Sequence, residues 1–287
     1  MFNKICVRLI GGLGNQLFIY AFAVARAKKQ GKELLIDNVS GFSKRDIYKA
    51  EFTLDGFHIN DIFINNKFLK YFIANRYFWW VAKKLRLSYI DNNLVGYYIE
   101  EIDNVKSKFF DGYWQSYLYF HEFKDIIKSN LSIKDSESSK IINYKKRILN
   151  SKNAVAIGLR FYESFPGDDS THHVANEAYY ANAIEYIESK EKDLTYFVFS
   201  MNIDRAKKVL SKFDDRNIVF INPQLEMQDA KLDMYLMSLC SHYIISSSTM
   251  YWWAAYLGET HLSVVIAPNE GLYNKDALPP HWIKLKQ

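Results

Sequence analysis

Short apolar runs alternate with helical patterns through the second half of the chain, and this alternation restricts the fold more than any other feature. Five runs rich in β-branched and aromatic residues have the length of strands, and four segments between them have helical spacing. Such an order predicts a parallel, doubly wound sheet covered by helices on both faces. The predicted strands are 153–160, 195–200, 217–222, 242–248 and 261–268, and the predicted helices are 177–190, 203–213, 228–241 and 250–257.

The first half of the chain opens with the same alternation. A predicted strand at 4–10 leads into a glycine-rich turn, a helix from about 15 to 29 ended by Gly31, and a strand at 33–37. Beyond residue 39 the pattern loosens into short aromatic segments. The polar stretch 130–153 is the best candidate for a domain boundary. We therefore predict an α/β protein with two Rossmann-like domains, 1–150 and 151–287, facing a cleft.

Composition narrows the class of partner. The 287 residues include 37 Lys and Arg against 32 Asp and Glu, a net charge of +5 that is spread along the chain. Nucleic-acid binding is not expected, because such domains concentrate their basic residues in one stripe; small phosphorylated ligands fit better. The two cysteines lie in apolar runs, which indicates buried thiols in a reducing compartment. No signal peptide and no apolar run of transmembrane length is recognisable, so we expect a cytoplasmic protein.

Polar residues follow the predicted strands where ligands of open parallel sheets bind, beyond the carboxyl ends of the strands. A glycine turn, an arginine and a hydroxyl cluster before a helix are all suited to binding phosphate, through backbone N–H groups, a guanidinium and the helix dipole. The candidate residues for binding a phosphorylated ligand are Gly11, Gly12, Gly14, Asn15, Gln16, Arg160, Asn202, Ser247, Ser248 and Thr249.

Each of these signals also has a structural explanation. The glycines can simply form a tight turn, Arg160 can form a surface ion pair, and the hydroxyl cluster can cap the next helix. As a dinucleotide fingerprint the turn is incomplete, because Leu17 stands where a third glycine is needed. Asp37, at the end of the second strand, nonetheless suits a ribose contact. An NAD(P)-dependent oxidoreductase therefore remains an alternative.

Two further pairs of residues are candidates for ligand contact and for proton transfer. Trp114 and Gln115 belong to a polar and aromatic run and are candidates for contact with a ligand. Glu163 and Asp168, beyond the strand that ends at Arg160, are candidate general bases. No metal site is expected: the chain has no Asp-x-Asp, and its paired histidines are adjacent and cannot share a helical face.

Together these segments resemble the α-1,2-fucosyltransferases of glycosyltransferase family 11 over nearly the whole chain. The resemblance is carried, in order, by GGLGNQLFIYAFAVARAKKQG, DGYWQSYLYF, YFVFSMNIDRAKKVL, DMYLMSLCSHYIISSSTMYWWAAYLGE and ALPPHWI. It implies a GT-B-like fold, with an acceptor-side N-terminal domain in which Trp114 and Gln115 bind the acceptor and a C-terminal domain that binds a GDP-linked donor. It also implies no metal or other cofactor, and inversion at the anomeric carbon. The family's His-x-Arg-Arg-Gly-Asp block reads GLRFYE here, so the histidine and the second arginine are missing and the acid is Glu163. Only Arg160 carries over, as the diphosphate clamp.

The leading hypothesis is transfer of L-fucose, or a related 6-deoxyhexose such as colitose, from GDP to a hydroxyl of a glycan or lipid-linked oligosaccharide. By family analogy the linkage is α-1,2 and the product belongs to bacterial surface polysaccharide, the O-antigen. A third hypothesis is a non-catalytic membrane- or glycan-binding module, because segment 69–90 combines many aromatic and basic residues. The same segment leaves open a peripheral contact with the inner face of the cell membrane; a buried helix with one solvated face explains it as well.

Overall fold

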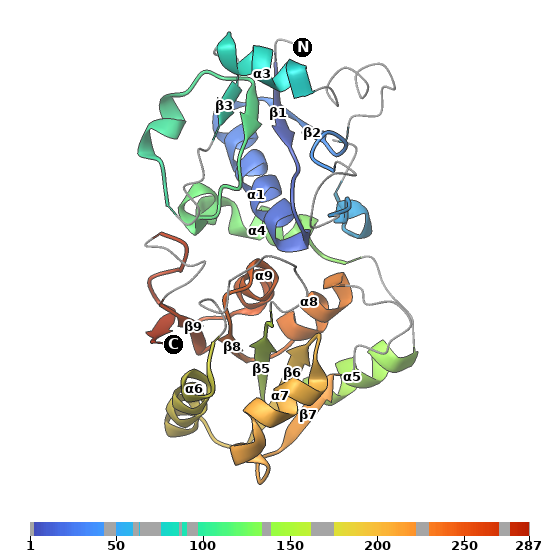
Figure 1. Ribbon diagram of the computed structural model, residues 1–287, viewed down its shortest axis with the longest axis vertical. Helices are drawn as coiled ribbons and strands as arrows, with labels where there is room; N and C mark the ends of the chain where they lie inside the picture. The colour runs from blue at the N-terminus through green and yellow to red at the C-terminus, as the bar shows by residue number, and fades with distance from the viewer. Residues whose placement is uncertain are drawn as a thin grey trace. The chain divides into compact units, whose positions relative to one another are not determined.

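The computed structural model describes residues 3–42, 50–59, 63, 76–85, 88–90, 97–133, 139–161, 175–221, 230–269 and 276–286. The chain divides into two compact units (Figure 1). The first comprises Met1–Lys134 and Lys275–Ala277, and the second comprises Asp135–Asn274 and Leu278–Gln287. The division lies inside the polar stretch 130–153 but earlier than position 150, so the helix that follows it belongs to the second unit.

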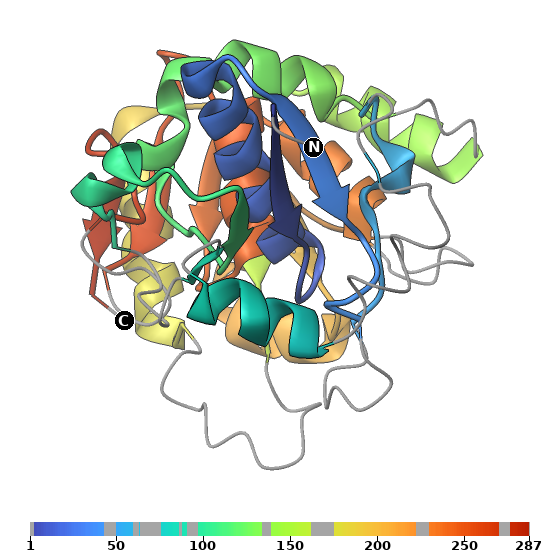
Figure 2. The same ribbon diagram turned by 90° about the horizontal axis from the view of Figure 1, so that it is seen from above.

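The first unit contains a four-stranded parallel sheet in the order β2-β1-β4-β3. The long helix α1 begins after Gly12 and ends at Gly31, whose φ of 60° and backbone N–H to Lys28 O form the expected left-handed cap. Figure 2 shows β1 and β2 side by side, with α1 along the sheet. The elements are β1 (Lys4–Arg8), α1 (Leu13–Gln30), β2 (Glu33–Asp37), α3 (Arg76–Lys84), β3 (Ser88–Ile90), β4 (Phe109–Asp111) and α4 (Lys124–Asn130), with 3-10 turns at Leu54–Gly56, Glu100–Asn104, Tyr117–Tyr119 and His121–Phe123.

Successive residues of β4 point to opposite faces of this sheet and hold a helix on each. The ring of Phe110 meets Phe22 of α1 edge-on, with centroids 5.5 Å apart. The ring of Phe109 meets Phe78 of α3 at 5.2 Å, next to Cys6. The alternation that strands impose on side chains therefore explains why α1 and α3 lie on different faces.

The short segment near the C-terminus that belongs to the first unit is held there by Asp276. Its carbonyl oxygen accepts a hydrogen bond from the buried Ser116 hydroxyl at 2.6 Å, and its carboxylate accepts one from the Tyr98 backbone N–H at 3.1 Å. Nothing in the sequence analysis predicted this return of the chain to the first unit.

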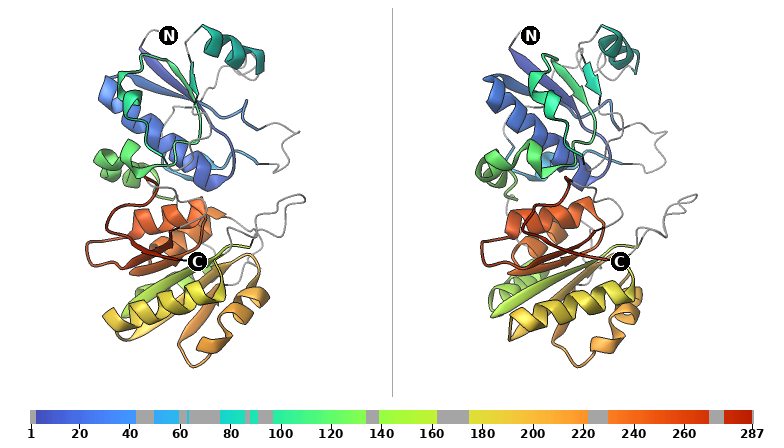
Figure 3. Two further views of the ribbon diagram at one scale, coloured as in Figure 1. Left: turned by 60° about the vertical axis from the view of Figure 1, so that its left-hand side comes forward. Right: turned by 90° about the vertical axis from the view of Figure 1, so that its left-hand side faces the viewer.

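The second unit contains a six-stranded parallel sheet in the order β10-β9-β8-β5-β6-β7. Helices α6 and α7 lie on one face of the sheet and α8 and α9 on the other (Figure 3). The doubly wound α/β fold predicted from the alternation is confirmed. The elements are α5 (Ser139–Leu149), β5 (Asn153–Leu159), α6 (Glu177–Lys190), β6 (Leu194–Ser200), α7 (Ile203–Val209), a 3-10 turn (Ser211–Phe213), β7 (Ile218–Ile221), α8 (Ala230–Ser238), β8 (His242–Ile245), α9 (Thr249–Gly258), β9 (Val265–Pro268) and β10 (Ile283–Leu285).

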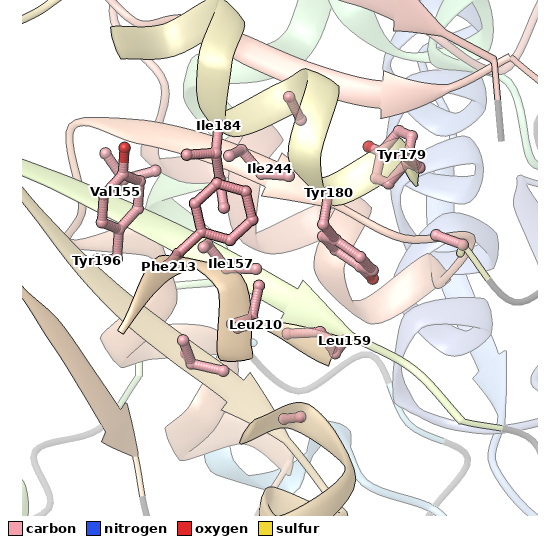
Figure 4. Packing of buried hydrophobic residues seen from close by; sticks show 14 of the residues in the cluster. Val155, Ile157, Leu159, Tyr179, Tyr180, Ile184, Tyr196, Leu210, Phe213 and Ile244 are labelled. Carbon is pink, nitrogen blue, oxygen red and sulfur yellow. The ribbon is translucent and has the colours of Figure 1, made fainter. Parts of the chain in front are cut away.

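The core of the second unit accounts for much of the aromatic content. Val155, Ile157 and Leu159 of β5 face one side of the sheet and pack with Tyr179 and Tyr180 of α6 and their neighbours (Figure 4). Both tyrosine rings are buried, and burying a phenol is favourable only when its hydroxyl finds a partner. Each hydroxyl donates to a carbonyl at the end of a strand, Tyr179 to Ile245 O at 2.6 Å and Tyr180 to Gly158 O at 3.1 Å.

Candidate functional site

The topology of the second unit creates a switch point at the carboxyl ends of β5 and β8. From β5 the chain moves outward through β6 and β7, then returns to place β8 on the other side of β5. Open α/β sheets bind ligands in the crevice where the strand order reverses in this way. Arg160 directly follows β5, and the serine run 246–248 directly follows β8. The predicted phosphate-binding residues of this unit therefore come to one edge.

Arg160 and the serine run are joined across the switch point. The backbone N–H of Arg160 donates to Ser246 Oγ at 3.1 Å. Nη1 of the Arg160 side chain lies 2.8 Å from the sulfur of Met201, a residue that is 56% exposed. The Arg160 side chain is half-buried at this edge. A guanidinium in this position fixes positive charge where a ligand can reach it.

The serine run leads directly into the N-terminus of α9. Ser246 and Ser247 are fully buried, and Ser248 is the N-cap residue of the helix. The Ser248 side chain makes no capping hydrogen bond, and the first turn, which begins at Thr249, holds no acidic residue. The explanation of the hydroxyl cluster as a simple side-chain cap is therefore not supported. The N-terminus of α9, which favours negative charge, lies next to the edge that holds Arg160.

Asn202 has a structural role as well. Its Oδ1 accepts a hydrogen bond from the Arg205 backbone N–H at 3.0 Å and so caps α7. The side chain is exposed at the end of β6, next to the edge that holds Arg160. Asn202 thus lies near the edge that holds Arg160, and its side-chain oxygen is used to cap α7.

Buried tyrosines stiffen this edge, and the sequence analysis did not identify them. Tyr251 of α9 donates to Phe199 O at 3.1 Å and Leu159 O at 3.3 Å, and Tyr179 and Tyr180 bond the ends of β8 and β5. Gly158 is required beside Tyr251, because a Cβ atom there would lie 2.6 Å from the ring. The sequence signal that could have identified these residues is a tyrosine on the buried face of a helix, because a buried tyrosine needs a hydrogen-bond partner for its hydroxyl.

The first unit has its own switch point, between β1 and β4. The glycine turn follows β1 and the Trp-Gln motif follows β4. The Trp-Gln motif meets the first turn of α1, just after the glycine turn, because Gln115 Nε2 donates to Asn15 Oδ1 at 2.8 Å. Gly11 has a φ of 71°, and a Cβ atom on it would lie 2.6 Å from Asn15 Nδ2. Glycine at position 11 therefore serves both the turn and the placement of Asn15.

Gln16 is buried, and its amide is used entirely within the protein. Its Nε2 donates to Gly11 O at 2.8 Å and to Glu51 O at 2.7 Å, and its Oε1 accepts from the backbone N–H and hydroxyl of Thr53 at 3.0 and 3.2 Å. A carboxamide has four hydrogen-bonding positions, and all are occupied. The structure thus makes Gln16 a clamp between the glycine turn and segment 51–53, rather than the donor contact expected from the sequence. Gly14 lies buried inside α1, not in the turn.

Trp114 lies in the core of the first unit, which disagrees with its predicted contact to an acceptor. Its side chain is 0% exposed and stacks on Phe22, with centroids 4.0 Å apart and planes at 5°. Its φ of 54° is unusual for a non-glycine residue. This backbone turn directs the indole inward and leaves the neighbouring Gln115 at the switch point. In the motif, Gln115 is the side chain that reaches Asn15 at the start of α1.

Asp37 does not have the role that the oxidoreductase alternative required. Its carboxylate is 1% exposed and accepts hydrogen bonds from the backbone N–H groups of Val39 and Ser40, both at 3.0 Å, and from the Ser40 hydroxyl. It therefore shapes the turn after β2. Nearby, Arg8 forms a two-pronged ion pair with Asp111 at 3.1 and 3.2 Å. Burial raises the pKa of Asp111, against the lowering effect of the Arg8 guanidinium.

The remaining predictions concern the candidate bases, metal binding, the cysteines and membrane-spanning helices. Glu163 and Asp168, the candidate bases, lie outside the described residues. Across the described ranges, no group of three or more His, Cys, Asp or Glu side chains is arranged to hold a metal ion. Cys6 and Cys240 are buried free thiols, and burial raises the pKa of both. Among the helices that the structure describes, none is both long enough and apolar enough to cross a bilayer.

Comparison with known proteins agrees with this architecture. The sequence is similar to an α-1,2-colitosyltransferase of Escherichia coli, 28% identical over 99% of both chains. It is also similar to the O-antigen biosynthesis glycosyltransferase WbnK of Escherichia coli, 28% identical over 96% of this chain and 99% of the relative.

Two solved structures share the fold. The α-1,6-fucosyltransferase NodZ of Bradyrhizobium, soaked with GDP-fucose, has a TM-score of 0.54 at 14% identity over 90% of this chain and 93% of its own. The fucosyltransferase FUT1 of Arabidopsis thaliana, in complex with GDP, has a TM-score of 0.55 at 14% identity over 96% of this chain and 73% of its own. The family model described as Glycosyl transferase family 11 matches residues 4–286. The chain therefore belongs to glycosyltransferase family 11 and is a glycosyltransferase.

Proposed function

We propose that this enzyme transfers a 6-deoxyhexose, L-fucose or colitose, from its GDP-linked form to a hydroxyl of a bacterial surface glycan or its lipid-linked precursor. The observation that carries the proposal is the switch point of the second unit, where Arg160 and the N-terminus of α9 converge. The names of the relatives support the sugar class, since one transfers colitose and another acts in O-antigen synthesis. GDP is supported by the two fucosyltransferase structures of the same fold, which bind GDP or GDP-fucose.

In this proposal the second unit holds the donor and the first unit serves the acceptor. The acceptor oxygen attacks the anomeric carbon with inversion as the bond from that carbon to the diphosphate oxygen breaks. A carboxylate, Glu163 or Asp168, takes the hydroxyl proton. Arg160 and the N–H groups at the start of α9 stabilise the negative charge on the departing GDP, without a metal ion or other cofactor. Gln115, which is hydrogen-bonded to Asn15, contacts the acceptor.

Donor profiling tests the proposal directly. The purified enzyme is incubated in EDTA with GDP-fucose, GDP-colitose, GDP-mannose and UDP-galactose, each with a fucosylatable galactoside acceptor, and nucleoside diphosphate release is measured. Release of GDP from a GDP-6-deoxyhexose at a rate at least tenfold above the other donors supports the proposal. A preference for UDP-galactose, or an absolute need for a divalent cation, contradicts it.

The Arg160→Ala variant provides the matched test of the clamp. Removing one preorganised charge contact to the leaving group should lower the transfer rate by about 100-fold. The circular dichroism spectrum should not change, because the Arg160 side chain is half-buried at the sheet edge and not in the core. Transfer within a few fold of the unsubstituted enzyme would exclude this role for Arg160.

A second observation favours contact with a membrane surface. Helix α3 packs inward through Phe78, whereas four apolar side chains on and just after it face solvent. Tyr77 is 64% exposed, Trp80 59% and Leu85 63%, with Val81 between them at 42%. Exposed Lys83 and Lys84 accompany them, and Lys84 Nζ lies 5.0 Å from the Trp80 ring centroid. A helix with such an apolar stripe beside lysines suits the headgroup region of anionic lipid.

Flotation with vesicles tests this contact. At low salt the enzyme should float with vesicles that contain phosphatidylglycerol and remain behind with vesicles of phosphatidylcholine alone. Trp80→Glu should abolish flotation, whereas Leu262→Glu, at a site 72% exposed in the other unit, should not affect it. Equal flotation of the enzyme and its Trp80→Glu variant would reject α3 as the contact.

A further inference from the structure

Arg205 brings a second guanidinium to the edge where Arg160 lies. It is the third residue of α7, the helix that follows β6, and its Cζ lies 4.4 Å from the centroid of the Phe161 ring. Phe161 directly follows Arg160 in the chain and is 9% exposed. No role was predicted for Arg205 from the sequence, because the residue belongs to the predicted helix 203–213 and not to the polar residues directly after a strand.

The register of the sheet explains why these residues meet. β5 and β6 pair in parallel up to their last residues, Leu159 opposite Ser200. The chain therefore leaves both strands side by side, with Arg160 next to Met201, and their side chains are in contact at 2.8 Å. α7 begins only two residues later, so its first turn stands directly beside the segment that carries Phe161.

The stacked position gives Arg205 a particular chemistry. A guanidinium over an aromatic ring uses its flat face for the cation–π contact and is held in one orientation. The N–H groups of a guanidinium lie in its plane, and this geometry matches phosphate oxygens two at a time. The Phe161 ring therefore serves as a platform: it holds the Arg205 guanidinium in an orientation that suits binding of an oxyanion.

Charge points to the same kind of ligand. Two guanidinium-bearing residues reach one sheet edge, beside a helix N-terminus that adds positive potential. Like charges gathered at one place repel each other, and a ligand with more than one negative charge relieves that repulsion. A diphosphate carries two phosphoryl groups in a chain and can span two separate guanidinium groups.

We propose that Arg205, held on the Phe161 ring, is a second cation of the diphosphate clamp and binds the donor together with Arg160. The inference rests on the proposed function only in that the second unit binds a nucleotide sugar; it does not depend on the base or the sugar. Arg205 is then a binding residue that determines how tightly the diphosphate is held.

Calorimetry on the full-length enzyme tests this role by comparing GDP and UDP with guanosine. Arg205→Ala should weaken binding of the nucleoside diphosphate by about 10- to 100-fold, as expected for a lost charge-assisted hydrogen bond, and should change guanosine binding less than twofold. Arg205→Lys, which keeps the charge without the planar fork, should lie between. Phe161→Leu should also weaken GDP binding, by a smaller factor, because Arg205 loses its platform. Lys208→Ala, an exposed cation on the same helix, is the control and should bind GDP as the unsubstituted enzyme does.

The possible outcomes separate this inference from the proposed function. If Arg205→Ala binds GDP within twofold of the unsubstituted enzyme, or loses guanosine and GDP binding equally, the clamp role is overturned and the donor proposal stands. If the enzyme prefers UDP, and Arg205→Ala weakens UDP binding, the donor proposal fails and the clamp stands. If no nucleoside diphosphate binds, both are overturned.

Discussion

Single polar side chains hold the loops of this enzyme in place, and Gln16 is the clearest case. It joins the glycine turn to segment 51–53 through four hydrogen bonds from a fully buried amide. Gln16→Leu keeps the size of the side chain but leaves two carbonyl groups and the Thr53 N–H without this partner. We expect a loss of about 3 kcal/mol in the free energy of unfolding.

The melting temperature and the urea midpoint measure this loss. Gln30→Leu is the control, because Gln30 ends the same helix and its side chain only accepts one bond, from Lys32 Nζ at 2.8 Å. Its midpoint should change little. If Gln16→Leu were as stable as Gln30→Leu, the four hydrogen bonds of Gln16 would contribute nothing to the free energy of unfolding.

For single residues, the sequence predicted where the candidate site residues lie better than it predicted what each of them contacts. The Arg160 edge, the serine run and the glycine turn all lie at the carboxyl ends of strands, as expected. The roles of Trp114 and Gln16 differ from those predicted, because burial depends on packing between distant segments. One backbone turn with positive φ at Trp114 decides which side of the motif faces the core. Nothing local in the sequence marks that turn, since non-glycine residues adopt it rarely.

At the scale of elements, the carboxyl end of β5 depends on its glycine. The position 158 backbone approaches Tyr251 so closely that a Cβ atom would lie 2.6 and 2.7 Å from two ring carbons. The ring cannot retreat without losing its hydrogen bonds to Leu159 O and Phe199 O. Gly158→Ala should therefore destabilise the protein by about 1–3 kcal/mol, as overpacking does, and should weaken GDP binding at the displaced edge.

Gly12→Ala offers a matched comparison. Its φ is −73°, and apart from its two chain neighbours no atom of the described residues lies within 4 Å of the position of a Cβ, so alanine fits there without strain. Thermal unfolding of the two variants should show a clear loss for position 158 and a change below about 0.5 kcal/mol for position 12. Equal stability would show that α9 accommodates the extra methyl group.

His242, at the start of β8, makes the stability of the second unit depend on pH. It is 4% exposed, and its Nδ1 accepts the Val264 backbone N–H at 3.1 Å, which requires the neutral ring. Burial lowers its pKa, against a smaller opposing effect of Glu191. Below the ordinary histidine pKa of about 6.5 the unfolded chain then binds a proton that the folded chain resists. The contribution of neutral His242 to the free energy of unfolding is therefore complete above about pH 6.5 and is lost as the pH falls below that value.

The measurement is the melting temperature between pH 7.5 and 5.5, compared with that of His242→Asn. The asparagine Oδ1 can accept the same Val264 N–H without titrating. We expect the unsubstituted enzyme to lose more of its melting temperature on acidification than the variant does. Parallel profiles would remove His242 as the cause.

The order and type of elements in the second unit were predictable, and their ends were less so. The predicted strand 242–248 ends at Ile245, because the three serines leave the sheet for the N-terminus of α9. The predicted helix 203–213 ends at Val209 and continues as a 3-10 turn. β10 was not predicted: three residues are too few for a periodic signal, and the strand exists because β9 offers an edge.

At the scale of the whole molecule, each unit is a parallel sheet with its own switch point, and each switch point gathers motifs that lie far apart in the sequence. In the first, residues 15 and 115 meet; in the second, residues 160 and 246 do. The alternation of elements fixes where such points occur, whereas the ligand that each one binds depends on its side chains. The central claim is that the second one binds the diphosphate of a GDP-sugar.

Calorimetric titration of the full-length enzyme in EDTA with GDP, UDP, CDP, ADP and NAD tests that claim most directly. We expect GDP to bind at least tenfold more tightly than any other nucleotide in the panel, and we expect Arg160→Ala to lose this binding while remaining folded. Tighter binding of UDP, ADP or NAD, or GDP binding that is unaffected by Arg160→Ala, would contradict it.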